Sequence, residues 1–176
     1  MLDLVNRKNL QRWLKYAAGL MGFSVLYVML DFSVDLRPPG IHNSYQFTLP
    51  PLAFDEPVLL RQDNLVIVVI RRSADTISKL HAITNKLQDP GSLASRQPEF
   101  ARNPVRSHDP EYFVAIALGT HLGCPIEVDG SWLTETCSDA RYDFAGRALQ
   151  GANEFRNLTV PEYVFADQLK TLTIRP

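Results

Sequence analysis

The sequence predicts a mainly β protein: an antiparallel β-sandwich domain with one helix, carried on a single N-terminal transmembrane helix. Three observations support this prediction. An uncharged apolar run occupies residues 16–30, and short β-branched or aromatic runs separated by turn residues follow from residue 44. Between Ser73 and Leu87, apolar residues recur at helical spacing. The composition, 45% hydrophobic and 21% charged, is typical of a folded globular protein.

The N-terminal segment has the charge pattern of a membrane anchor. Lysines and arginines precede the apolar run, and Asp31 and Asp35 follow it. Because basic residues mark the cytoplasmic side of a span, we expect a cytoplasmic N-terminus at residues 1–12 and a transmembrane anchor at residues 13–32. The chain would then be a single-pass protein of the inner (cytoplasmic) membrane with a periplasmic C-terminal domain. A cleaved signal peptide and a buried core helix are less favoured alternatives, because small-x-small residues do not follow Leu30 and the run has no amphipathic stripe.

The rest of the chain is expected to form a linker and one domain. Residues 33–43 include two prolines and a glycine and indicate a linker or neck, and residues 44–176 form the domain. The polar residues 91–109 are expected to be a surface excursion. Strands are expected at residues 45–49, 58–60, 65–72, 112–118, 132–134, 142–144, 163–165 and 172–174, with 65–72 and 112–118 buried on both faces.

Charge and cysteine content limit the possible functions. The net charge of −1 provides no basic field, so nucleic acid is not an expected partner. The histidines at positions 42, 81 and 108 have no ligand spacing and are expected on the surface. Two cysteines, Cys124 and Cys137, are enough for one disulfide or for two unrelated buried thiols. Outside the cytoplasm, the disulfide is chemically reasonable.

Residues 119–147 contain the most informative pattern. The segment begins GTHLGCP and later continues ETCSDARYDFAGR. It resembles the two cluster-binding loops of the Rieske iron–sulfur subunits of ubiquinol–cytochrome c reductase, a cytochrome bc-type complex, whose usual forms are CTHLGC and CPCHGSxYDxxGR. The resemblance extends over residues 6–174, through LVIVVIRRSADTI, RSHDPEYFVAIAL and NLTVPEYVF. It implies a Rieske-like fold for residues 44–176, with residues 119–147 as degenerate cluster-binding loops.

Compared residue by residue, the resemblance implies a [2Fe–2S] site that has been lost. In the family each loop supplies one cysteine and one histidine to the cluster. The two ligand cysteines fall on Gly119 and Glu135, and the second ligand histidine falls on Ser138. His121 is then the remnant ligand. We therefore expect no cofactor, no metal and no catalytic residue.

The resemblance also implies a covalent link and a set of partners. The two remaining family cysteines, which join the loops, match Cys124 and Cys137, while a tyrosine of the second loop matches Tyr142, which we expect to pack inside the domain. The implied partners are cytochrome b and cytochrome c-type subunits, together with membrane lipid. The possible partner-docking tip consists of His121, Leu122, Gly123 and Pro125.

Three functional hypotheses follow. The first is a cluster-less, Rieske-like subunit of a respiratory electron-transfer complex, either cytochrome bc-type or a supercomplex containing it, with a structural or assembly role and no catalysis of its own. The second is a redox-sensing module in which Cys124 and Cys137 form a switchable disulfide. The third is a replacement mononuclear metal site built from His121, Glu135 and Asp139, since histidine and carboxylates can hold zinc or iron.

Overall fold

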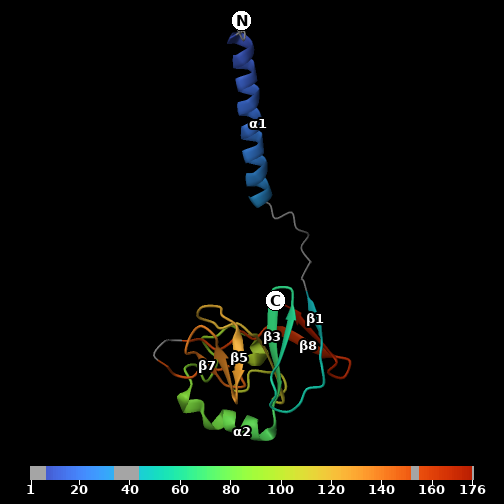
Figure 1. Cartoon of the computed structure of the whole chain (residues 1–176), viewed down its shortest axis with the longest axis vertical. Helices are drawn as coiled ribbons and strands as arrows, with labels where there is room; N and C mark the ends of the chain where they lie inside the picture. The colour runs from blue at the N-terminus through green and yellow to red at the C-terminus, as the bar shows by residue number, and fades with distance from the viewer. Residues whose placement is uncertain (1–6, 34–43, 152–154, 176) are drawn as a thin grey trace. The chain divides into compact units, whose positions relative to one another are not determined.

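The computed structural model describes residues 7–33, 44–151 and 155–175, and the chain divides into two units, Met1–Ile41 and His42–Pro176 (Figure 1). The described part of the first unit is one helix, α1 (Arg7–Ser33). The second unit, called the head domain below, contains all the described strands. Most of the expected linker, and His42 with it, lies outside the described residues.

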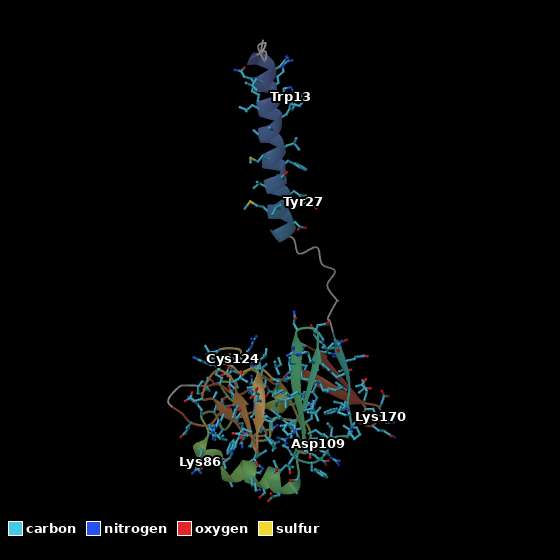
Figure 2. All side chains as sticks on the ribbon, in the orientation of Figure 1. Trp13, Tyr27, Lys86, Asp109, Cys124 and Lys170 are labelled. Atoms are coloured by element: carbon cyan, nitrogen blue, oxygen red, sulfur yellow. A yellow bond between two sulfur atoms is a disulfide. The ribbon has the colours of Figure 1, made fainter. Side chains whose placement is uncertain are left out.

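Helix α1 is long and apolar enough to cross a membrane. Its apolar part, Asn9–Asp31, has 23 residues, a mean hydropathy of 1.4 and no buried residue. At about 1.5 Å per residue, that length covers the roughly 30 Å hydrocarbon core of a bilayer. Large apolar side chains such as Trp13 and Tyr27 project outward from this helix (Figure 2). The expected apolar N-terminal helix is confirmed, and its length and composition are consistent with a single-pass membrane anchor.

The head domain is built from antiparallel sheets of three strands each. Their strand orders are β1-β9-β8, β2-β3-β4 and β5-β6-β7. The bounds are β1 Tyr45–Thr48, β2 Val58–Gln62, β3 Leu65–Arg71, β4 Tyr112–Ile116, β5 Ile126–Asp129, β6 Trp132–Glu135, β7 Arg141–Tyr142, β8 Glu162–Ala166 and β9 Thr171–Arg175. The mainly β, antiparallel fold class is confirmed. Strand β5 was not predicted, because its sequence IEVD carries two acidic residues and has only one buried position.

Strand β3 forms the centre of the core. It lies between β2 and β4, and all four residues from Ile67 to Ile70 are fully buried. This placement explains its uninterrupted β-branched sequence, since a strand covered on both faces has no polar side to alternate with. In the pairing with β4, Val69 lies opposite Val114 and Ile70 opposite Phe113. The expectation that this strand is buried on both faces is confirmed.

Helix α2 (Ala74–Ala82) follows β3 directly. The Ser73 hydroxyl caps it by accepting a hydrogen bond from the Thr76 N–H at 3.2 Å. The helix ends at Ile83, earlier than the apolar spacing predicts, and a short 3₁₀ turn, η1 (Thr84–Lys86), continues to the buried Leu87. A second 3₁₀ turn, η2 (Glu99–Ala101), lies between α2 and β4.

The expectation that residues 91–109 form a surface excursion holds only in part, because about half of them are exposed and four are buried. Four residues of the segment, Ser92, Ala101, Arg106 and Ser107, are buried. The Arg106 guanidinium donates hydrogen bonds to the carbonyls of Ala145, Gly146 and Leu158, at 3.0, 3.0 and 2.6 Å. Burial lowers the pKa of Arg106 to about 10. Part of this polar segment lies inside because its arginine donates to buried backbone carbonyls; the Gly146 carbonyl also accepts from the Leu158 N–H, at 2.8 Å.

Candidate functional site

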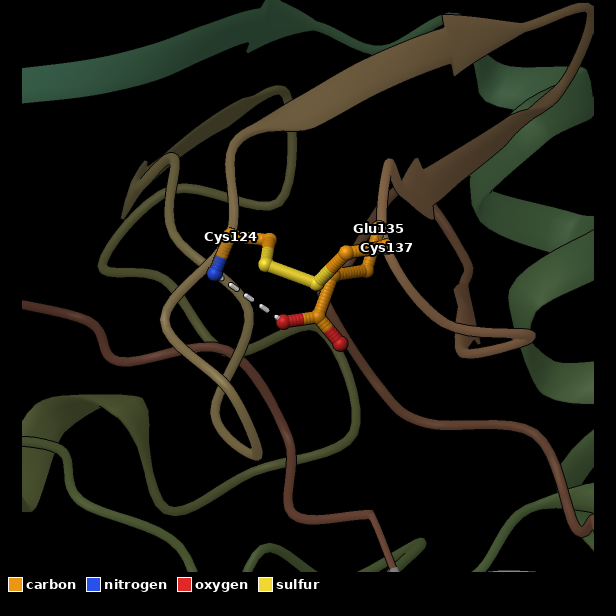
Figure 3. Close-up of side chains that lie close together, drawn as sticks. All are labelled: Cys124, Glu135 and Cys137. Carbon is orange, nitrogen blue, oxygen red and sulfur yellow. Dashed lines mark hydrogen bonds between the residues drawn. A yellow bond between two sulfur atoms is a disulfide. The ribbon is translucent and has the colours of Figure 1, made fainter.

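The two loops predicted from residues 119–147 lie side by side at one end of the β5-β6-β7 sheet. Residues 117–125 connect β4 to β5, and residues 136–140 connect β6 to β7. The disulfide Cys124–Cys137 joins them, with its Cα atoms 6.0 Å apart (Figure 3). The Thr136 N–H also donates to the Pro125 carbonyl at 3.0 Å. The disulfide implied by the family resemblance is confirmed.

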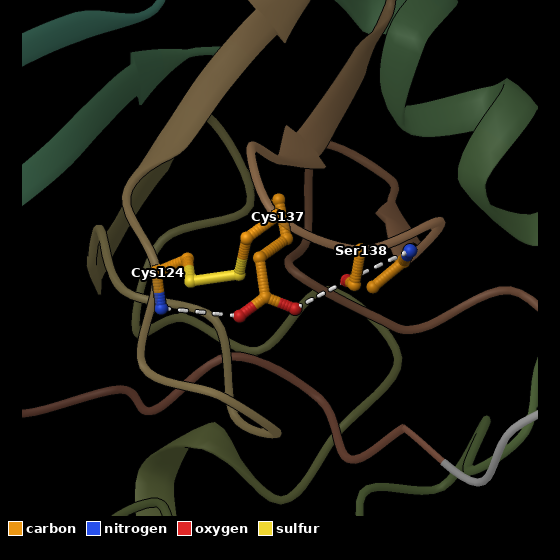
Figure 4. Close-up of a disulfide and its surroundings, with 5 residues drawn as sticks. Cys124, Cys137 and Ser138 are labelled. Carbon is orange, nitrogen blue, oxygen red and sulfur yellow. Dashed lines mark hydrogen bonds between the residues drawn. A yellow bond between two sulfur atoms is a disulfide. The ribbon is translucent and has the colours of Figure 1, made fainter.

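Glu135 is the central side chain between the loops. It is the last residue of β6 and is only 2% exposed. One carboxylate oxygen accepts a hydrogen bond from the Cys124 N–H at 3.2 Å, and the other accepts from the Ser138 hydroxyl at 2.6 Å (Figure 4). The Ser138 oxygen in turn accepts from the Ala140 N–H at 3.2 Å. These bonds hold the carboxylate in one orientation.

Gly119 and Glu135 are complementary in shape. A Cβ atom added at Gly119 would overlap the Glu135 carboxylate and would lie 2.7 Å from its Cγ. The carboxylate therefore fills the space that a side chain at position 119 would need. Ser138 holds that carboxylate in place. The three positions that the resemblance matches to lost cluster ligands thus form one contact group.

A polar cavity opens beside this group. It has a volume of about 380 Å³, and Glu135 and Ser138 lie on its wall. Three further acidic residues line it, namely Glu127, Asp129 and Asp139. The cavity connects the buried carboxylate to solvent on the acidic side of the sheet.

His121 and Asp139 do not join Glu135 in a ligand set. Both are exposed, and the His121 ring packs edge-on against Phe155, with ring centroids 5.7 Å apart. Over the described ranges, the three residues whose ligand atoms lie within 4.8 Å of one another are Cys124, Glu135 and Cys137. The structure therefore does not bring together the predicted set His121, Glu135 and Asp139. The sequence alone did not group Glu135 with the cysteines. The spacing of Glu135 and Cys137 could have indicated it, because side chains two residues apart at a strand end lie on the same face.

The remaining predicted residues lie as follows. The four residues of the possible docking tip are exposed, and Leu122 is 60% exposed. His81 and His108 are on the surface as expected. Tyr142 is fully buried, which confirms that it packs inside the domain, and burial raises the pKa of its hydroxyl. Within the described residues, that hydroxyl has no hydrogen-bond partner.

The rest of the second loop is anchored by a buried ion pair. Asp143 and Arg147 lie 2.7 Å apart, with side chains 3% and 0% exposed. Asp143 also accepts from the backbone N–H groups of Ala145 and Arg147, each at 2.9 Å. Gly146 has φ of +64° and lies against Phe113, where a Cβ atom would come within 2.7 Å of the ring. Glycine is therefore required at this turn both by its backbone conformation and by its close packing.

Comparison with known proteins points to one class. No family model matches the chain. It is 33% identical over 116 residues to the ubiquinol–cytochrome c reductase iron–sulfur subunit of Allochromatium vinosum, a match that covers 59% of this chain and 56% of the relative. It is 36% identical over 159 residues to the mitochondrial cytochrome b-c1 complex subunit Rieske-1 of Nicotiana tabacum, covering 88% of this chain and 57% of the relative.

A maize relative and one solved structure give further matches. The mitochondrial cytochrome b-c1 complex subunit Rieske of Zea mays is 36% identical over 159 residues, covering 88% of this chain and 54% of the relative. A chain of a hyperthermophilic respiratory complex III superposes with a TM-score of 0.46 at 15% identity, covering 92% of this chain and 98% of that chain.

The fold and the sequence relatives define a Rieske-like β domain that follows an apolar N-terminal helix. More particularly, the chain is similar in sequence to the Rieske iron–sulfur subunits of cytochrome bc1 complexes, at 33% to 36% identity. It spans 56% and 57% of the length of the first two of these relatives.

Proposed function

We propose that this chain is a cluster-less, Rieske-like subunit of a membrane respiratory electron-transfer complex, with a structural or assembly role in place of electron transfer. The complex is of cytochrome bc type, or a supercomplex that contains one. The proposal rests on one observation above others: the Glu135 carboxylate fills the space that a ligand side chain at position 119 would occupy.

The residues present do not fit a [2Fe–2S] cluster. A Rieske cluster needs two cysteine thiolates and two histidines. This chain has two cysteines, and the disulfide uses both. At the positions matched to the other ligands, Gly119 offers no donor atom, and the Ser138 hydroxyl is engaged with Glu135. His121, the one retained ligand type, packs against Phe155.

The substituted site has its own set of contacts in place of a cluster. In the family, the cluster holds the two loops together; here the disulfide joins them, and Glu135 adds a hydrogen bond across the gap to Cys124. Because the loops are still tied, their tip keeps a defined shape with Leu122 exposed at its end. An exposed apolar side chain on a fixed loop is suited to contact with another protein.

Location and partners follow from the family. We place α1 across the inner membrane with the N-terminus in the cytoplasm and the head domain in the periplasm. Cytochrome b and cytochrome c-type subunits are the expected partners, with the tip at residues 121–125 as the docking segment. The basic residues before the apolar run and the acidic ones after it support this orientation.

Purification of the full chain from its native membranes tests the proposal. We expect cytochrome b and cytochrome c-type subunits to co-purify, as identified by mass spectrometry. The electron paramagnetic resonance spectrum of the reduced sample should contain no Rieske-type signal that comes from this chain. Membranes of a strain that lacks the chain should therefore show the same Rieske-type signal, or the same absence of one, as the wild type. A signal assigned to this chain would overturn the cluster-less part, and purification without any cytochrome subunit would overturn the subunit part.

A matched variant sharpens the cluster test. The triple substitution Gly119→Cys, Glu135→Cys and Ser138→His restores the family ligand set and removes the carboxylate that blocks it. Expressed beside the wild-type chain, the variant should contain more iron and acid-labile sulfide per chain. Equal iron in the two chains at cluster stoichiometry would contradict the proposal.

A further inference from the structure

The disulfide and Glu135 form a cluster of possible metal ligands that differs from the family site. The ligand atoms of Cys124, Glu135 and Cys137 lie within 4.8 Å of one another (Figure 3). Sulfur and carboxylate oxygen are both ligands that zinc accepts, at about 2.3 Å and about 2.0–2.2 Å. Two ligands of one tetrahedral ion are about 3.5 Å apart, so the carboxylate lies within reach of an ion held by the sulfurs, while the two sulfurs, bonded to each other here, must separate once the disulfide is reduced.

Glu135 forms no ion pair with a described basic side chain, although Arg141 lies on the wall of the same cavity. Its hydrogen-bond donors, the Cys124 N–H and the Ser138 hydroxyl, are neutral, and the ion pairs of the described residues do not include it. The other buried acidic residue, Asp143, is paired with Arg147 at 2.7 Å. A buried carboxylate without a cation is costly, and a bound divalent cation would remove that cost.

The surroundings provide orientation and access. The Ser138 hydroxyl and the Cys124 N–H hold the two carboxylate oxygens, as outer-sphere groups commonly do around a metal ligand. Cys137 is exposed, so a reductant can reach the disulfide. The polar cavity of about 380 Å³ beside Glu135 gives an ion a path from solvent, and its lining, with Glu127, Asp129 and Asp139 against Arg141, has an excess of acidic groups that attracts cations.

We propose that reduction of the Cys124–Cys137 disulfide creates a zinc site with both thiolates and the Glu135 carboxylate as ligands. An external dithiol supplies two electrons and two protons, the S–S bond breaks to give two thiols, and the dithiol becomes a disulfide. Zn²⁺ then displaces both thiol protons and forms two Zn–S bonds and one Zn–O bond. Water completes the tetrahedron. In the oxidised chain the sulfurs are bonded to each other, and the site does not exist.

Metal titration of the full-length chain in detergent tests this inference. The chain is reduced with a phosphine, desalted without oxygen, and titrated with Zn²⁺ against a chelating dye, and separately with Co²⁺. The reduced chain should bind one Zn²⁺, and its Co²⁺ form should show thiolate-to-metal absorption. The oxidised chain should bind none. Equal Zn²⁺ affinity of the reduced and oxidised chains would overturn the inference.

Variants identify the ligands. Glu135→Gln keeps the shape and a hydrogen-bond acceptor, and should raise the Kd for Zn²⁺ at least about 100-fold, because it removes a ligand and even the loss of an outer-sphere group costs about 10–100-fold. His121→Ala and Asp139→Asn are the matched controls, because both residues are exposed and outside the group. Their Kd should change by less than about twofold. An unchanged affinity in Glu135→Gln, or a large loss in either control, would show that a different ligand set binds the metal.

A folding measurement covers the case in which reduction loosens the domain. Thermal unfolding of the reduced chain is followed by circular dichroism with and without Zn²⁺. Because a ligand that binds only the folded state stabilises it, Zn²⁺ should raise the Tm of the reduced wild type and leave that of Glu135→Gln nearly unchanged. No shift in the wild type would overturn the inference. Either result leaves the iron and co-purification tests of the proposed function unaffected.

Discussion

The two buried carboxylates of the second loop region have opposite environments. Asp143 is part of the sequence YDFAGR, which matches the family pattern, and it forms an ion pair with the buried Arg147. Glu135 stands where the family has a cluster ligand, and its hydrogen-bond donors are neutral groups. The first carboxylate belongs to a segment that matches the family motif, and the second lies at a position where this chain departs from it.

The contacts around Asp143 are separate from those at the three positions matched to cluster ligands. The framework around Asp143 is held by the arginine, two backbone N–H groups and the close packing of Gly146 on Phe113. None of these contacts involves positions 119, 135 or 138. The framework around Asp143 is therefore independent of the residues at these three positions.

Breaking the framework should have the largest effect. Asp143→Ala leaves Arg147 charged, buried and unpaired, so we expect a loss of about 3–5 kcal/mol in the free energy of unfolding. Urea denaturation followed by circular dichroism measures it. Asp75→Ala is the control, because the Asp75–Lys79 pair is more than two-thirds exposed on α2 and should contribute nothing measurable. Similar losses in both variants would contradict the comparison.

Removing the disulfide should be the next largest effect. The link between Cys124 and Cys137 spans a sequence separation of 13 residues. In the chain-entropy model, a loop of this length stabilises the fold by about 3 kcal/mol. The double substitution Cys124→Ser and Cys137→Ser should therefore lower the urea midpoint and make the slope of the transition somewhat steeper, because the unfolded chain becomes less compact. The wild-type chain under reducing, zinc-free conditions should show the same loss, and a difference between the two would point to an effect of the serines themselves.

Much of the fold was predictable because its signals are local. The β-branched run of β3 predicts a strand covered on both faces, and Ser73 predicts the start of α2. The burial of Arg106 was not predictable, since its acceptors are carbonyls about 40 residues or more along the chain, at Ala145, Gly146 and Leu158.

The sequence predicted the positions at which this site departs from the family motifs, but it did not predict the contacts that the residues at those positions form. The motifs identify Gly119, Glu135 and Ser138 as changed positions, and the disulfide pairing follows from the family pattern. That the Glu135 carboxylate fills the space above Gly119 depends on the separation of two loops in three dimensions. No local periodicity in the sequence encodes that separation. The sequence alone therefore also grouped His121 and Asp139 with Glu135 as metal ligands, although the structure does not bring them together.

A double-mutant cycle tests whether the side chains at positions 119 and 135 compete for the same space. Gly119→Ala places a methyl group where the Glu135 carboxylate lies, and such overpacking should cost about 1–3 kcal/mol. When Glu135→Ala is already present, the same substitution should cost much less, which gives a coupling energy of about 1–2 kcal/mol. Gly91→Ala is the control, because its Cβ would meet only ordinary contacts, the nearest at 3.6 Å to the Leu93 Cγ. Additive losses at Gly119 and Glu135 would show that the two do not share one space.

The smallest effect is expected at Ser138. Its hydroxyl donates to Glu135 at 2.6 Å and accepts from the Ala140 N–H at 3.2 Å, but the residue is only half-buried. Water can replace the hydroxyl at both partners, so Ser138→Ala should cost about 1 kcal/mol. Ser138→Thr retains the hydroxyl and is the matched control for stability by urea denaturation. If Ser138→Ala instead cost as much as Asp143→Ala, Glu135 would depend on a single donor as strongly as Asp143 depends on its arginine, and the contrast between the two carboxylates would fail.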